Sequence, residues 1–178
     1  MKLWKVCSLA LGAAIVAGPA LADSDIGKPA RDFTITTLDR QKVRLSDLKG
    51  KVIVVNRWAT WCTPCKAEMA ALETFMRLHP DTDLKIYAVT VELEYSASKL
   101  KPLQAILHYP IATSVSHAYQ IKGGVPTSYV IDRAGILRFA AAGALDEAGF
   151  EALVNPLLAQ AAPQPAPAAA PTAPPPAP

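Results

Sequence analysis

The chain has 178 residues, a length that fits one domain of ordinary size. Its 18 basic and 15 acidic residues give a formal net charge of +3 at pH 7. Lys2 and Lys5 lie in a leading segment that we expect to be removed, which leaves 16 basic against 15 acidic residues. Because the remaining basic residues are dispersed along the chain, we expect no nucleic-acid partner.

The first 22 residues have the pattern of a secretory signal peptide. Lys2 and Lys5 precede an apolar run from Val6 to Val16, and the segment from Ala20 to Ala22 is typical of a cleavage site. We therefore predict an exported, periplasmic protein that begins near Asp23. The alternative is an uncleaved membrane anchor, although the apolar run is short for a membrane span.

Hydrophobic patterning predicts alternating strands and helices over residues 23–160. In chain order, strands are predicted at 33–36, 43–45, 52–58, 84–91, 127–132 and 136–140, and helices at 66–78, 98–107 and 146–159. The first two strands form a hairpin, and the strand–helix–strand order over 52–91 implies a parallel crossover. The fold class is therefore α/β, with a central mixed β-sheet flanked by helices and preceded by an N-terminal β-hairpin.

The end of the chain, residues 161–178, consists almost entirely of Ala and Pro and holds eight of the 16 prolines. Such a composition cannot bury enough apolar area to fold, so we predict a disordered tail.

Two cysteines, Cys62 and Cys65, lie where the buried strand 52–58 gives way to the helix 66–78. The first N–H groups of a helix have no intrahelical partner, and the helix dipole adds partial positive charge there. A thiolate is favoured at such a place, so we expect Cys62 to be the attacking thiol. Cys65, one turn further and more buried, is expected to resolve a mixed disulfide.

A CxxC pair also occurs in zinc sites, which need four ligands. The only other cysteine, Cys7, lies in the segment predicted to be removed, and His79, His108 and His117 are scattered. We therefore predict no metal and no cofactor, with a redox-active Cys62–Cys65 disulfide in place of one. A passive structural disulfide is the remaining alternative.

Several segments resemble, in the right order, parts of the thioredoxin-fold proteins. Residues 58–65 (WATWCTPC) resemble their active-site segment, and Gly124 to Thr127 resembles the loop that carries a cis-proline. The segment from Ile26 to Gly50 resembles the N-terminal extension of the TlpA/ResA-like (DsbE-type) exported thiol-disulfide oxidoreductases. The resemblance covers about residues 26–158 and implies a thioredoxin fold.

The resemblance also implies roles around the cysteines. Pro126 is expected to follow a cis bond, and the backbone of Val125 to pair with an extended substrate segment. Trp61 is expected to offer substrate an apolar contact.

Thioredoxin has a buried Asp at the position of Asn56, and asparagine cannot transfer a proton. Glu68, three residues after Cys65, occupies a place where ResA-type reductases carry an acid. We expect it to exchange a proton with Cys65. The alternative is a solvated glutamate on the helix surface.

Arg57 stands where relatives usually carry an aromatic residue. A guanidinium at the end of a buried strand must find a carboxylate or reach solvent. The candidate partners in the sequence are Glu68, Glu92 and Glu94. The alternative is a side chain whose charged end extends to the surface.

The resemblance implies an enzyme that reduces disulfides in exported partner proteins during cytochrome c or cytochrome oxidase maturation. Its substrates would be proteins such as apocytochrome c or copper-centre maturation proteins, and a membrane thiol transporter would supply electrons. The sequence does not fix the direction, because CxxC proteins span potentials from about −270 to about −120 mV.

Two other functions stay open. One is a copper-handling protein, since two thiolates can hold Cu(I), although no nearby Met or His completes a site. The other is a peroxiredoxin-type peroxidase, which shares the leading hairpin. Such enzymes have Pro and Thr or Ser shortly before the reactive cysteine, whereas this chain has Ala59 three residues before Cys62.

Overall fold

The computed structural model describes residues 25–92, 97–116 and 119–163. Within these ranges the strands form one mixed sheet of seven strands in the order β2-β1-β5-β4-β3-β6-β7. Strand β3 pairs in parallel with β4, which pairs in parallel with β5, and the other pairs are antiparallel. The strands are β1 (Thr34–Thr37), β2 (Lys42–Arg44), β3 (Val52–Trp58), β4 (Leu84–Thr90), β5 (Ile111–Val115), β6 (Thr127–Ile131) and β7 (Leu137–Ala142).

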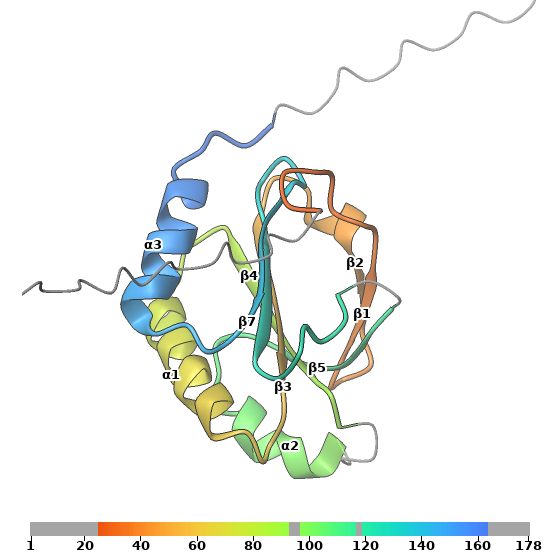
Figure 1. Ribbon diagram of the computed structural model, residues 1–178. Coiled ribbons are helices and arrows are strands. Elements are labelled where there is room, and N and C mark those ends of the chain that lie inside the picture. Colours follow the sequence, from red (N-terminus) through yellow and green to blue (C-terminus); the bar gives the residue numbers. More distant parts are fainter. Residues whose placement is uncertain (1–24, 93–96, 117–118, 164–178) are drawn as a thin grey trace, which may run out of the picture.

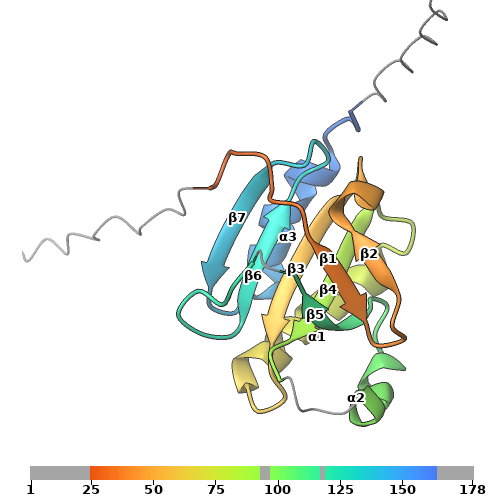
Figure 2. The same cartoon turned by 90° about the vertical axis from the view of Figure 1, so that its right-hand side faces the viewer.

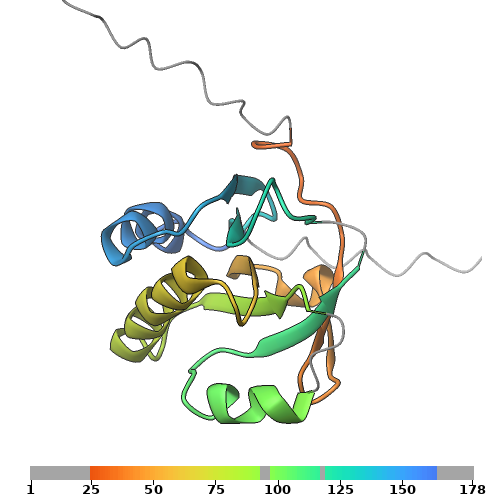
Figure 3. The same ribbon diagram turned by 60° about the horizontal axis from the view of Figure 1, so that its bottom comes forward.

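The helices are α1 (Thr63–Leu78), α2 (Ala97–Gln104) and α3 (Glu147–Leu158), with a 3-10 turn, η1 (Leu45–Leu48), after β2. Helices α1 and α3 pack against each other on one side of the sheet, and the β1–β2 hairpin forms one edge of the sheet (Figures 1 and 3). None of the helices in the described part of the chain has the length and hydropathy that crossing a membrane requires.

Strand β3 is buried on both faces, which explains why its sequence shows no polar alternation. Val52, Val54 and Trp58 pack into the core under α1 and α3. Ile53 and Val55 point to the opposite face, into a second core with Phe33, Tyr87 and Tyr129 among its members. Because successive side chains of a strand alternate between faces, each residue of β3 is assigned to one core by its position.

The predicted fold class is confirmed, with the hairpin β1–β2 leading and the parallel β3–α1–β4 crossover at the centre. Strand β3 has the predicted bounds, whereas α1 begins three residues before the predicted position 66 because Pro64 is accommodated in the first turn. Helix α2 spans 97–104 rather than 98–107, and α3 spans 147–158 rather than 146–159. Strand β5 was not predicted at all.

Several sequence-based predictions fall outside the described residues. They concern the signal peptide and its cleavage, Cys7, Glu94, His117 and the tail beyond residue 163. The boundaries of the three predicted regions therefore stay predictions.

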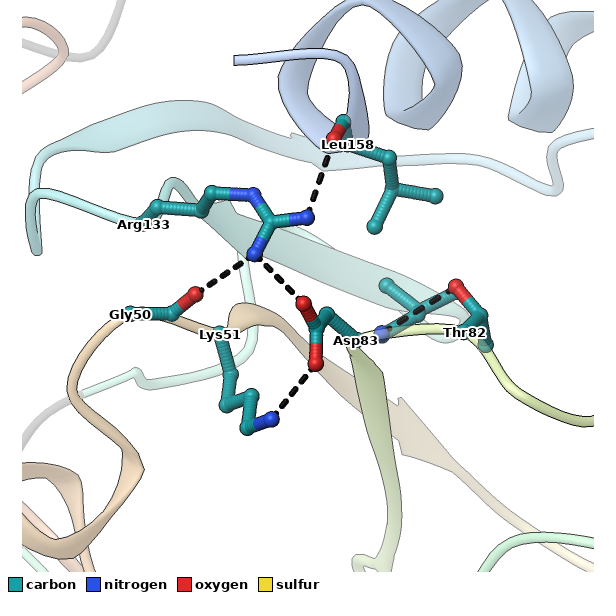
Figure 4. A network of polar contacts seen from close by, with 7 residues as sticks. Gly50, Lys51, Thr82, Asp83, Arg133 and Leu158 are labelled. Atoms are coloured by element: carbon teal, nitrogen blue, oxygen red, sulfur yellow. Dashed lines mark hydrogen bonds and ion pairs between the residues drawn. The ribbon is translucent and has the colours of Figure 1, made fainter. Parts of the chain in front are cut away.

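A network of charged groups holds together the end of the sheet at which β3 begins (Figure 4). Arg133, in the β6–β7 turn, donates from Nη1 to the carbonyl of Gly50 and to Asp83, both at 2.8 Å. Its Nη2 donates to the carbonyl of Leu158 at 2.9 Å, where α3 ends. Lys51 pairs with the second oxygen of Asp83. Arg133 thereby ties α3 to the strands at the end where β3 begins. The β3–α1 connection lies at the other end of the sheet (Figures 1 and 2).

Candidate active site

Cys62 is the N-cap residue of α1, at the point where the chain turns from β3 into the helix. Its Sγ accepts a hydrogen bond from the backbone N–H of Cys65 at 3.2 Å, so the sulfur occupies the place of an N-cap oxygen. The two cysteines form a disulfide. Cys62 is 4% exposed and Cys65 is 0% exposed, so an incoming reagent reaches Cys62 first.

Glu92 fixes the loop that leads into Cys62. Its carboxylate accepts hydrogen bonds from the backbone N–H of Thr60 at 2.6 Å and from the Thr60 hydroxyl at 2.9 Å. The backbone N–H of Val91 donates to the carbonyl of Trp58. The loop is therefore attached to the chain just after β4, which limits how far Cys62 can move. Sequence reasoning did not foresee the role of Thr60.

The Val125–Pro126 peptide bond is cis, as predicted. The carbonyl oxygen of Val125 lies 3.5 Å from Cys62 Sγ, a contact rather than a hydrogen bond because a disulfide sulfur carries no proton. Thr127 supports this loop, since its hydroxyl donates to the carbonyl of Gly124 at 2.6 Å. The Val125 backbone thus lies directly beside the more accessible cysteine.

Trp61 is 68% exposed although it is a large apolar side chain. It immediately precedes Cys62 in the sequence, so an apolar surface adjoins the disulfide. Exposure of an aromatic ring beside a reactive group is typical of a surface that contacts a partner.

Glu68 lies on the buried side of α1 and is 1% exposed, so the alternative of a solvated surface glutamate is wrong. Its Oε2 accepts a hydrogen bond from Asn56 Nδ2 at 2.8 Å, and its Oε1 accepts one from the Ser128 hydroxyl at 3.1 Å. The backbone N–H of Leu145 lies 3.4 Å from Oε1. Asn56 Nδ2 also donates to Ser128 Oγ at 2.8 Å, so the three side chains are joined pairwise.

Burial raises the pKa of Glu68 above its ordinary value, and hydrogen bonds from Asn56, Ser128 and Leu145 oppose that rise. A carboxyl with a raised pKa exchanges its proton closer to neutral pH. Glu68 and Cys65 share the buried side of the first turns of α1. The site therefore holds a buried carboxyl with a raised pKa on the same helix face as the inner cysteine.

The sequence pointed to Glu68 but not to Ser128 or to the backbone of Leu145. A polar residue inside the apolar strand β6 was the one signal available for Ser128, which is 1% exposed. No sequence pattern marked the backbone of Leu145.

Arg57 lies on the opposite face of β3 from Asn56, which excludes Glu68 as the partner of its guanidinium. The carboxylate of Glu92, a second candidate, binds Thr60 instead. Glu94 lies outside the described residues. Burial lowers the pKa of the Arg57 guanidinium, and within the described ranges no ion pair joins it to a carboxylate.

Comparisons with known proteins agree with this geometry. Residues 26–140 match the model of the AhpC/TSA family. A thiol-disulfide oxidoreductase ResA of Bacillus cereus is 35% identical over 114 residues, which cover 62% of this chain and 65% of that protein. The chain thus spans slightly less than two thirds of the length of that relative.

ResA of Oceanobacillus iheyensis is 32% identical over 147 residues, which cover 76% of this chain and 74% of that protein. Among solved structures, a thiol:disulfide interchange protein of the thioredoxin family from Chlorobium tepidum TLS aligns with a TM-score of 0.63 at 26% identity. That alignment covers 73% of this chain and 95% of the solved one, and it confirms the predicted thioredoxin fold.

Proposed function

The chain belongs to the AhpC/TSA family, and on that premise we propose that it is a protein thiol-disulfide oxidoreductase of the ResA type. The observation that carries the proposal is Cys62 at the N-cap of α1, bonded to a more buried Cys65. A helix N-terminus favours the thiolate that such an enzyme needs, and the named relatives are thiol-disulfide oxidoreductases.

In the reduced form, the thiolate of Cys62 attacks one sulfur of a substrate disulfide. A mixed disulfide forms, and the other substrate sulfur leaves as a thiolate. Cys65 then loses its proton to Glu68 and attacks Cys62 Sγ, which releases the second substrate thiolate and leaves the Cys62–Cys65 disulfide. The substrate disulfide gains two electrons, and the protein dithiol loses them.

Substrate recognition is assigned to three residues around Cys62. The carbonyl of Val125 lies beside the attacking sulfur, and the cis bond at Pro126 belongs to the same loop. An extended substrate segment would pair with the Val125 backbone, as in other cases where a peptide adds to an exposed backbone edge. Trp61 would cover the apolar part of the segment.

The proposed direction is reduction of disulfides in exported proteins. The predicted signal peptide and the similarity to ResA proteins support this direction and a periplasmic location. By the same resemblance, the proposed partners are apocytochrome c or copper-centre maturation proteins as substrates, with a membrane thiol transporter as electron donor. The proposed cycle needs no cofactor.

The decisive measurement is the reduction potential of the Cys62/Cys65 pair, obtained by equilibrating the protein with defined thiol–disulfide buffers. We expect a value closer to about −270 mV than to about −120 mV, the two ends of the range for CxxC proteins. A potential at the oxidising end would overturn the reductive direction.

The two cysteine roles are tested with a disulfide-containing peptide. Cys65→Ser should accumulate a mixed disulfide with the peptide, because attack on it has been removed, and Cys62→Ser should form none. Accumulation in Cys62→Ser instead would reverse the assignment.

Two further measurements on the reduced protein test the alternative functions, copper handling and peroxide reduction. Stoichiometric Cu(I) binding that survives competition by a strong chelator would favour a copper-handling protein. Rapid consumption of hydrogen peroxide would favour a peroxidase.

A further inference from the structure

We infer that Asn56 is a positioning residue whose side-chain amide turns over by half a rotation when Glu68 gains a proton. The inference rests on the proposed function, in which Glu68 receives the proton of Cys65. It goes beyond that function by assigning the group that accommodates the proton inside a closed interior.

The hydrogen bonds around Glu68 are those of an ionised carboxylate. Both hydrogens of Asn56 Nδ2 are engaged, one by Glu68 Oε2 and one by Ser128 Oγ. The single hydrogen of the Ser128 hydroxyl is directed at Glu68 Oε1. Every side-chain hydrogen in the cluster therefore already has an acceptor, and both carboxylate oxygens act as acceptors.

The amide oxygen of Asn56 stands out because it is buried and has no hydrogen-bond partner within the described part of the chain. Asn56 is 0% exposed, so bulk water does not satisfy this oxygen. A buried polar atom without a partner keeps the full cost of leaving water, so its presence calls for a physical reason. Within this cluster, Oδ1 of Asn56 is therefore a hydrogen-bond acceptor that no described group uses.

A protonated Glu68 needs such an acceptor. Its new O–H must donate, and Oδ1 of Asn56 is the acceptor of the cluster that lacks a donor among the described residues. Half a turn about the Cβ–Cγ bond exchanges Oδ1 and Nδ2, after which Glu68 Oε2–H donates to Oδ1. The two ends of an amide have nearly the same size, so the buried side chain can turn without moving its neighbours.

An aspartate at this position would behave differently. Two carboxyl groups in contact would titrate as a coupled pair, since like charges in a buried site oppose each other. Asparagine leaves Glu68 as the one titrating carboxyl among the three bonded side chains. It offers Glu68 Oε2 an N–H when the carboxyl is ionised and its amide oxygen when the carboxyl is protonated, and in the second case its own two hydrogens lose their acceptors.

Other titratable groups surround Glu68 on each packed element. On α1 these are Cys65 and Glu73, and Glu73 is paired with His108. From the segment before β5, Tyr109 donates its hydroxyl to the carbonyl of Met69 at 3.0 Å. At the start of α3, the N-cap residue Asp146 and the first helical residue Glu147 join Glu68 in lining a surface hollow of about 400 Å³. In the described part of the chain, none of these groups forms an ion pair with Glu68.

The test is a pH titration of the disulfide form by NMR, with the Asn56 side-chain amide and the Glu68 carboxyl carbon observed together. When Glu68 is ionised, both amide hydrogens are bonded, and after protonation both lose their acceptors. We expect both amide proton signals to move upfield with the midpoint of the Glu68 signal, and to be independent of pH in Glu68→Gln. Amide signals that stay unchanged while Glu68 titrates would overturn the inference, as would a Glu68 that stays ionised throughout.

A second measurement uses Asn56→Leu, which keeps the volume but removes the amide. Without the donor, the ionised form of Glu68 is less stable, so the midpoint of the pH dependence of turnover should rise by roughly 1–2 pH units. The matched control is Val54→Ala, a buried change on the same face of β3, which should lower stability without moving the midpoint.

The proton role of Glu68 and the rotation of the Asn56 amide can be disproved separately. If Glu68→Gln changes the pH dependence of turnover while the amide of Asn56 does not respond to pH, the proton role of Glu68 stands and the rotation of Asn56 is wrong. If Glu68→Gln leaves the pH dependence unchanged, the proton role itself is lost.

Discussion

Two carboxyl groups, at opposite ends of the same central strands, have opposite properties. Glu68 is closed off from solvent and bonded to neutral donors, and burial raises its pKa. Asp83 is partly exposed and lies between Lys51 and Arg133, whose hydrogen bonds lower its pKa to about 2. The carboxyl group is the same chemically, so the difference comes from the partners and the burial around it.

The two ends of the sheet therefore differ in what their carboxyl groups do: one contributes to stability and the other lies beside the cysteines. At the end where β3 begins, permanent charges hold a carboxylate in its ionised form and tie α3 to the strands. At the end where β3 finishes, Asn56 of the same strand binds a buried carboxyl whose pKa is raised. Substitutions at the two ends of the sheet test this division.

Glu68→Gln should have the largest effect, because it removes the proposed proton acceptor on the same helix face as the inner cysteine. We expect the resolution of the mixed disulfide to slow by roughly 10²-fold and the pH dependence of thiol reactivity to shift. Stopped-flow measurement of resolution between about pH 5 and pH 9 checks both. The control is Glu73→Gln on the same helix, which should change neither, and an unchanged titration in Glu68→Gln would remove this residue from the mechanism.

Arg133→Ala should affect stability and leave the chemistry alone. It removes the donor to the carbonyls of Gly50 and Leu158, and hydrogen bonds from a charged group are worth more than neutral ones. We expect a melting temperature lower by roughly 5–10 °C, measured by calorimetry. Lys85→Ala, an exposed change on β4, is the control. A shifted pH profile of the thiols in Arg133→Ala would mean that the two ends of the sheet are coupled.

Asp83→Asn should lower stability at neutral pH, and the difference from the unchanged protein should disappear in strong acid. The folded-state pKa of about 2 lies below the ordinary value of 3.8, so the carboxylate adds stability above about pH 4. That contribution is lost as the pH falls from about 4 through 2. Urea unfolding at a series of pH values should therefore show a weaker dependence on pH in the variant over this window. Equal slopes in both proteins would show that the ion pairs add nothing in solution.

Lys51→Met should have the smallest effect. The Lys51 and Asp83 side chains are 40% and 42% exposed, and exposed ion pairs are largely screened by water and salt. We expect the melting temperature to change by less than about 2 °C. A larger fall would mean that Lys51, rather than Arg133, is the main cation at this end.

The parts of the fold that local patterns encode were predictable. Strand β3 and helix α1 have strong hydrophobic patterns, and their junction places the cysteines. Strand β5 escaped prediction because only Ile111 and Ala112 are buried, and the strand depends on pairing with β1 and β4, which are far away in sequence. Long-range pairing of this kind leaves little trace in the strand itself.

In the candidate active site, too, the contacts between residues far apart in sequence could not be predicted. Glu68 could be assigned because it follows Cys65 on a helix, whereas Ser128 contributes across 60 residues of sequence. Glu68 could have been excluded from the candidate partners of Arg57, because neighbouring residues of a strand face opposite sides and Asn56 already occupies the side of α1.

The described chain begins and ends at the side of the domain away from the β3–α1 connection (Figures 1 and 2). A fluorescent label, an affinity handle or a solid support attached through either of these two points would therefore sit far from the sulfur atoms. Immobilised protein should keep its access to large polypeptides, which makes surface-based capture of trapped complexes a practical experiment with this molecule.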